Sequence, residues 1–353
     1  WNITFREKLT YLFVAIAFIV SYVFGVGVHD ISWRYLEKLF KLSIFLFLMF
    51  RAVNSLEDFN VLIWVLIAGA VFLSWQAQII GDSHKGRLDN IGGPDFRDAN
   101  AFAAFLALNT VLLGFKILHT SWWKMFIGVV AIASMVNTIL LTQSRAVFIG
   151  LAFALIYAFF FFFLAIRKKI IVYSTLGVLL FAILAHDKFW DRMSTIQHEA
   201  KGIQLGEQFV VDDNINRLDF WASSIEIFMD HPLGIGVKNF EKIVSLYDPR
   251  NSGMDVHNTY ALCYTEIGIL GIIVFLFYII SGFIQLKRIR NYVINNDRFM
   301  HIKNISFALS LVFILYTSGP MVTHSYLYSE FMWIVFSLPI CFENSIKTYS
   351  QDQ

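Results

Sequence analysis

The chain has 353 residues, of which 57% are hydrophobic and only 15% are charged. A soluble domain of this composition would leave large apolar patches in water, so the sequence predicts an integral membrane protein. The formal net charge of +2 is too small to favour nucleic acid as a partner, and the basic residues stand in short clusters between apolar runs.

Continuous apolar runs of about 17 to 25 residues can cross the hydrocarbon core as helices, because a helix satisfies its own backbone polar groups. The runs do not alternate as the strands of a membrane barrel do, so we predict an all-α polytopic fold. About ten spans are expected, at residues 10–28, 35–51, 61–80, 101–118, 122–141, 146–166, 170–185, 262–285, 304–320 and 327–342. Together they predict a single transmembrane domain, residues 1–353. Because the chain starts at Trp1, we also expect that one or two N-terminal spans are missing.

Basic clusters orient the spans, because Lys and Arg are retained on the cytoplasmic side. The clusters at Arg167–Lys169 and Lys287–Lys303 are the clearest markers. They place residues 186–256 outside, as an extracytoplasmic loop subdomain, and the segment His186–Asp255 carries twelve acidic and seven basic residues. Within it, Asn216–Met229 predicts an amphipathic helix that ends at the breaker cluster His231–Gly236. Nucleotide donors are scarce on that side, so a donor is expected to arrive activated on a lipid.

His257 stands before an apolar span and is the candidate general base. A neutral imidazole can accept a proton from an attacking hydroxyl at neutral pH, and Asn258 could set its tautomer. Helical spacing would place Tyr260 on the same face as His257. The alternative is a histidine that simply caps the helix that follows.

Two arginines are candidates for binding phosphate, because a guanidinium fork matches phosphate oxygens and keeps its charge. Arg145 stands between two apolar runs, and its alternative role is to snorkel to headgroups or to pair with Glu330. Arg217 begins the amphipathic loop helix, where an ion pair with a neighbouring aspartate is the alternative.

Further polar residues could support such a site. Arg97 and Asp98 precede a span, where Asp98 could instead cap the helix, and His324 is expected on the same face as His257. No His or Cys stands at ligand spacing beside the aspartates, so no metal is predicted. No Gly-rich phosphate loop occurs and no cofactor is expected.

These motifs recur in a known arrangement. His257-Asn258, nine residues and then Gly268–Gly271 resembles the signature of bacterial O-antigen ligases. Pro232–Gly236 followed by His-Asn resembles the wider superfamily, which also contains O-antigen polymerases and bacterial O-oligosaccharyltransferases. The likeness includes Asp98–Asn100 and Ser144-Arg145, each at the head of a span.

The resemblance implies a C-type glycosyltransferase with its site facing the periplasm or cell exterior in the bacterial inner membrane. It further implies an undecaprenyl-pyrophosphate-linked glycan donor, a lipid-anchored or glycan acceptor, and an inverting, metal-independent reaction. By position, Arg145 and Arg217 would hold the pyrophosphate and His257 would be the base. A polymerase, a protein O-oligosaccharyltransferase and, from another class, a lipid or polysaccharide transporter remain alternatives. Such a transporter needs polar residues at mid-span, and Lys41 and Glu266 are among the few present.

Overall fold

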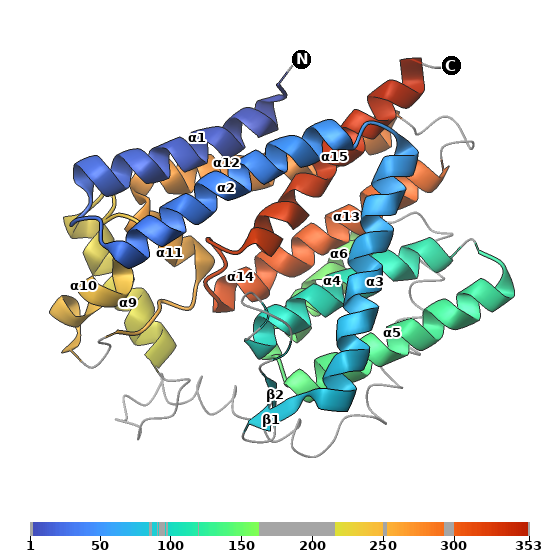
Figure 1. The fold of residues 1–353 in the computed structure, drawn as a ribbon, viewed down its shortest axis with the longest axis horizontal. Helices are drawn as coiled ribbons and strands as arrows, with labels where there is room; N and C mark the ends of the chain where they lie inside the picture. The colour runs from blue at the N-terminus through green and yellow to red at the C-terminus, as the bar shows by residue number, and fades with distance from the viewer. Residues whose placement is uncertain are drawn as a thin grey trace. The chain divides into compact units, whose positions relative to one another are not determined.

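The computed structural model describes residues 3–84, 87–89, 91, 96, 98–118, 120–161, 216–249, 253–292 and 300–351. Their regular structure is helical apart from one antiparallel hairpin, β1 (Asp82–His84) with β2 (Arg87–Asp89) (Figure 1). In this part of the chain, six helices are long and apolar enough to cross a membrane: Phe5–Phe24, Leu56–Ile80, Ala99–Ile117, Trp122–Thr142, Gly268–Asn291 and His301–Thr323. The chain is therefore a helical multi-pass membrane protein, while the count of ten spans stays a prediction.

The chain divides into two compact units, and the predicted single domain over residues 1–353 stays a prediction. Unit 1 comprises Trp1–Phe59, Gln208–Arg288 and Met321–Gln353, and unit 2 comprises Asn60–Glu207 and Ile289–Pro320. Unit 1 contains α1 (Phe5–Ile19), the π-helix η1 (Val20–Phe24), α2 (Asp30–Ala52), α9 (Asn216–Asp230), α10 (Phe240–Tyr247), α11 (Thr259–Glu266), most of α12 (Gly268–Tyr292) and α15 (Glu330–Gln351). Unit 2 contains most of α3 (Leu56–Ile80), α4 (Ala99–Ile117), α5 (Trp122–Thr142), α6 (Arg145–Phe161) and α13 (Met300–Ser318). The short α14 (Pro320–Thr323) follows α13.

A buried arginine joins three helices of unit 1. Arg6 on α1 is 4% exposed and donates to Oε1 of Gln285 on α12 at 2.7 Å and to the backbone oxygen of Phe336 on α15 at 2.8 Å. Its guanidinium also lies 4.6 Å from the ring centroid of Tyr278. A buried cation is costly without polar partners, so the bonds from the two terminal nitrogens of Arg6 specify how the three helices pack.

Unit 2 contains a close approach between backbones. A Cβ added to Gly150 on α6 would lie 2.3 Å from the backbone oxygen of Leu315 on α13. A Cβ added to Gly319, just after α13, would lie 2.1 Å from the backbone oxygen of Ala146. Small residues at such positions let membrane helices pack through their backbones.

The structure changes several predicted span boundaries. The span predicted at 262–285 is present as the candidate span Gly268–Asn291, and only its predicted start is wrong, because α11 ends at Glu266 and α12 begins at Gly268. The break is local: Gly268 has a φ of +75°, which an L side chain rarely adopts. Residues 170–185 lie outside the described residues. The helix α15, at the span predicted for 327–342, has 22 residues with Pro339 inside it and is not among the six candidate spans.

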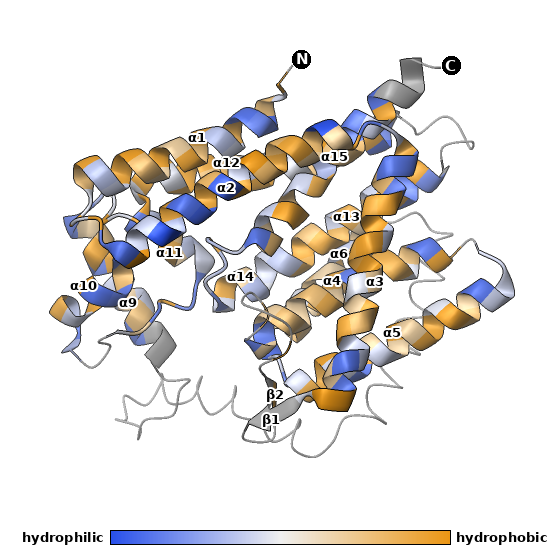
Figure 2. Cartoon of the chain, in the orientation of Figure 1, coloured by the Kyte–Doolittle hydropathy of each residue, from blue (hydrophilic) through white to orange (hydrophobic). Residues whose placement is uncertain are grey.

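The second predicted span, at 35–51, is a 23-residue helix, α2, that is also not among the six. His29 caps it, with Nδ1 accepting from the backbone N–H of Ser32 at 3.3 Å. Charged residues in its first half make α2 less apolar than the six candidate spans. Figure 2 shows this half as largely blue ribbon, while α3 and α5 are largely orange.

Candidate active site

The predicted base, His257, lies in unit 1 immediately before α11. The helix is capped by Asn258, whose Oδ1 accepts from the backbone N–H groups of Tyr260 at 2.9 Å and Ala261 at 3.1 Å. His257 itself has a φ of +50°, so it stands outside the helix in a strained left-handed conformation. The alternative that His257 caps the helix is therefore wrong, and so is the prediction that it shares a helical face with Tyr260.

A second histidine lies beside His257. The ring centroids of His257 and His324 are 5.6 Å apart, and Phe220 on α9 stands edge-on to His257 at 6.1 Å. Both histidines are half-buried. Nδ1 of His324 lies 2.9 Å from the backbone oxygen of Thr323, and a carbonyl oxygen only accepts, so this nitrogen is the donor. In the neutral ring, Nε2 is then the nitrogen that can take up a proton.

Hydrogen bonds hold the two histidines together although 67 positions separate them. Oγ1 of Thr259, the first residue of α11, donates to the backbone oxygen of His324 at 2.6 Å and accepts from the backbone N–H of Tyr326 at 3.0 Å. Oγ of Ser325 donates to Oδ1 of Asp255 at 3.0 Å. Thr259 is fully buried, so its two bonds are protected from competing water.

The breaker cluster Pro232–Gly236 packs against the other end of α11. The backbone N–H groups of Ile235 and Gly236 donate to the carbonyl oxygens of Thr265 at 3.0 Å and Glu266 at 2.9 Å. These bonds satisfy carbonyls that a helix C-terminus otherwise leaves without partners. The two glycine motifs of the sequence are thus one structural unit.

The glycines are required by this contact. Gly234 has a φ of +98°, and a Cβ there would lie 2.7 Å from both the backbone oxygen of Glu266 and the backbone nitrogen of Gly268. A Cβ on Gly268 would lie 2.3 Å from the carbonyl carbon of Leu233. Neither position has room for a side chain.

Glu266 is a buried carboxylate next to the glycine contact, and the sequence motifs did not indicate its role. Its side chain is 1% exposed, and its carboxylate accepts from the backbone N–H groups of Lys238 at 2.8 Å and Phe240 at 3.0 Å and from the hydroxyl of Tyr328. From its position in the sequence, Glu266 is expected to be a polar residue at mid-span that does not assist His257. A lone carboxylate two residues before Gly268, in an otherwise apolar run, was the available signal.

Burial governs the titration of this carboxyl group. It raises the pKa of Glu266 to about 7, although the bonds from Tyr328 and Phe240 and the nearby charge of Lys238 act in the opposite direction. Burial likewise raises the pKa of the Tyr328 hydroxyl, with the neighbouring carboxylate adding to the shift. A group that changes charge near neutral pH therefore lies at the C-terminal end of the helix whose N-terminal end follows His257.

The predicted phosphate-binding arginines belong to two other helices. Arg145 is the first residue of α6 in unit 2 and follows Gln143, which has a φ of +51°. Arg217 is in the first turn of α9, and its side chain is outside the described residues. The convergence of both arginines on His257 stays a prediction. Glu330, the alternative partner of Arg145, forms an ion pair with Lys38 at 2.7 Å.

Of the two remaining predicted residues before α4, the structure describes Asp98 but not Arg97. Asp98 caps α4, with Oδ1 accepting from the backbone N–H groups of Asn100 at 2.7 Å and Ala101 at 3.0 Å, as its capping alternative predicted. Arg97 lies outside the described residues. Among the residues that are described, no three His, Cys, Asp or Glu side chains form a metal-binding group. The prediction of a metal-independent reaction is not tested by this observation.

Comparison with known proteins gives one family. Residues 129–276 match the family model described as O-antigen ligase. This match confirms the resemblance to the O-antigen ligase superfamily, and it covers the Arg145, Arg217 and His257 positions together with both glycine motifs. No curated protein matches the chain.

Proposed function

We propose that this member of the O-antigen ligase superfamily transfers a glycan from undecaprenyl pyrophosphate to an acceptor hydroxyl, at the extracytoplasmic face of the bacterial inner membrane. The observation that carries the proposal is the paired imidazoles of His257, which lies within the family match at residues 129–276, and His324, which lies beyond it. A partly accessible imidazole on a strained turn is a group that catalysis requires and that stability alone does not select.

The reaction is an inverting displacement at the anomeric carbon. The acceptor oxygen forms the new bond to that carbon as the bond to the pyrophosphate oxygen breaks, and the electron pair leaves on the pyrophosphate. His257 takes the acceptor proton, and Nε2 of His324 then accepts a proton from the resulting imidazolium and releases it to solvent, which returns His257 to its neutral form. A pyrophosphate is a good leaving group, so the base and a cationic clamp are sufficient chemistry.

Arg145 and Arg217 are proposed to neutralise the departing pyrophosphate. The bidentate hydrogen bonds of a guanidinium strengthen as negative charge develops on the phosphate oxygens. This lowers the barrier to transfer rather than only improving donor binding. Changing Arg145 to Lys keeps the charge and loses the fork, so the use of the donor should weaken. Unchanged donor kinetics would favour the snorkelling alternative.

The test uses the purified chain in liposomes with a lipid-linked glycan donor and a lipid A core acceptor. His257→Ala should abolish transfer, while His231→Ala, a loop histidine after α9, should retain it. Both variants should elute as folded protein. Transfer by His257→Ala at the wild-type rate would remove this residue from the mechanism.

Product analysis in the same assay separates the reaction classes. A ligase attaches the glycan to the lipid A core, whereas a polymerase lengthens the glycan on the donor lipid when the core is omitted. A protein O-oligosaccharyltransferase would instead increase the mass of an exported acceptor protein. Longer chains on the donor lipid in place of glycosylated core would replace the ligase assignment with a polymerase.

A further inference from the structure

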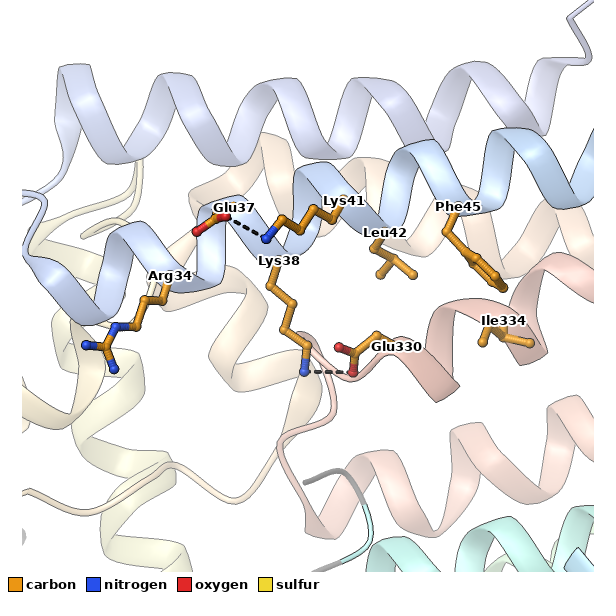
Figure 3. A pocket seen from close by; sticks show the side chains of 8 residues that line it. All are labelled: Arg34, Glu37, Lys38, Lys41, Leu42, Phe45, Glu330 and Ile334. Atoms are coloured by element: carbon orange, nitrogen blue, oxygen red, sulfur yellow. Dashed lines mark ion pairs between the residues drawn. The ribbon is translucent and has the colours of Figure 1, made fainter. Parts of the chain in front are cut away.

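A cavity of about 450 Å³ lies between α2 and α15 within unit 1, and neither His257 nor His324 lines it. Figure 3 shows the side chains that line it: Arg34, Glu37, Lys38, Lys41, Leu42 and Phe45 from α2, with Glu330 and Ile334 from α15. The cavity has a polar end and an apolar end, and this polarity follows the order of the residues along α2.

The polar end concentrates cations on one helix face. Arg34, Lys38 and Lys41 are spaced i, i+4 and i+7, which places them on the same side of α2. Ionisable residues among membrane helices are costly and usually mark a functional site. The helix is long enough to span a membrane, and these charges are what set it apart from the six apolar spans.

The charges of this cluster do not balance. Lys38 forms an ion pair with Glu330 at 2.7 Å, and Lys41 forms one with Glu37 at 2.6 Å. Arg34 makes no ion pair or hydrogen bond with any residue that the structure describes. In Figure 3 its guanidinium extends from α2 beyond both pairs, at the end of the row. One positive charge with a phosphate-matching geometry is therefore left over.

The apolar end of the cavity lies beyond the basic residues, towards the C-terminus of α2. Leu42, Phe45 and Ile334 line it, and the eleven helical steps from Arg34 to Phe45 span about 16 Å at a rise of 1.5 Å per residue. Half of a bilayer's hydrocarbon core is about 15 Å thick. The cavity thus has the polarity and the length that one lipid in one leaflet requires.

We propose that this cavity binds a phosphate-bearing lipid, with its phosphate at Arg34 and Lys38 and its chain along Leu42, Phe45 and Ile334. Inorganic phosphate would use only the cations, and a neutral lipid would use only the apolar end. The site goes beyond glycan transfer, and its occupancy does not depend on that reaction being correct.

Binding is tested on the full chain in detergent by native mass spectrometry with four probes. Phosphatidic acid and undecaprenyl phosphate both present a lipid phosphate, and whichever binds tighter identifies the source. Diacylglycerol lacks the phosphate, and inorganic phosphate lacks the chain, so both should bind at least tenfold more weakly than the better lipid phosphate. Equal binding of either of these two would overturn the proposal.

Two single substitutions give opposite expectations. Arg34→Gln should weaken lipid-phosphate binding about fivefold, the effect expected of one basic residue near a lipid phosphate. Glu330→Gln releases Lys38 from its ion pair, so it should tighten binding. A residue with only a structural role would not produce a tightening. The proposal fails if Glu330→Gln weakens binding or if Arg34→Gln leaves binding unchanged.

Matched controls isolate the cavity from general charge. Glu343→Gln removes a carboxylate from the same helix, where it pairs with Lys347 at 3.1 Å, and should leave binding unchanged. Ile334→Trp fills the apolar end without changing any charge, so it should weaken binding of the lipid phosphates and leave inorganic phosphate unaffected. If Ile334→Trp weakened binding of the lipid phosphates and of inorganic phosphate equally, the proposed orientation of the lipid would be contradicted.

Discussion

Replacing Glu266 with Gln tests whether the buried carboxyl controls the stability of the site. The ordinary pKa of the group is 4.5, and burial raises it to about 7 in the folded protein. Between pH 4.5 and about 7, Glu266 is therefore protonated in the folded protein and ionised in the unfolded chain. The stabilisation by this proton is fully present below about pH 4.5 and is lost as the pH rises through 7.

The size of the effect follows from the shift. A difference of about 2.5 pKa units corresponds to about 3 kcal/mol, and the 1% exposure of the side chain means that solvent screens little of it. Glu266→Gln cannot ionise, so this pH dependence disappears. The amide also places an N–H against the donors of Lys238 or Phe240, which costs about 1 to 3 kcal/mol at low pH.

The assay is thermal unfolding of the chain in detergent between pH 4.5 and 8. The wild type should lose stability relative to Glu266→Gln as the pH rises, and the two curves should converge near neutral pH. Glu226→Gln on α9, where the side chain is exposed, is the control and should follow the wild type. A wild-type-to-variant difference that stays constant across this range would refute the assigned titration.

Three further predictions concern the backbone around α11. The free energy of unfolding of His257→Gly should exceed that of His257→Ala by about 1 to 2 kcal/mol, because glycine adopts a φ of +50° without strain. Both variants should be inactive in transfer, and equal stabilities would argue against strain. Gly268→Ala should destabilise the protein by about 2 to 5 kcal/mol, since its Cβ meets backbone atoms, whereas Gly69→Ala, with nothing within 4 Å, is the control expected to retain stability. Asn258→Ala should cost about 1 kcal/mol in thermal unfolding and Asn258→Asp should restore it, because an aspartate still caps the helix; failure of that rescue would exclude capping as the cause.

Local patterns predicted the features that depend on short stretches of chain. The helix expected at Asn216–Met229 is present as Asn216–Asp230, and it ends at the breaker cluster His231–Gly236. The alternative in which Asp98 caps a helix is also confirmed. These outcomes follow from amphipathic spacing, proline and glycine chemistry, and side-chain capping, each of which acts within a few residues.

Some errors arose where local spacing suggested a continuation that the backbone does not make. Helical spacing from His257 to Tyr260 assumed that the helix already included the histidine. The cap at Asn258 and the positive φ of His257 place it outside. The predicted span at 262–285 joined two helices, because an apolar run does not reveal that Gly268 turns the chain.

Composition and the continuous apolar runs were enough to determine that this chain is a helical membrane protein, because non-alternating apolar runs of sufficient length satisfy their backbone groups as helices in lipid. Tertiary structure decided which polar groups meet. His324 reaches His257 through the two bonds of Thr259, and the carboxylate of Glu266 joins Tyr328 to the backbone after Gly236. Such contacts link positions about 30 to 70 residues apart, and no periodicity along the chain encodes which distant donor will face a buried acceptor.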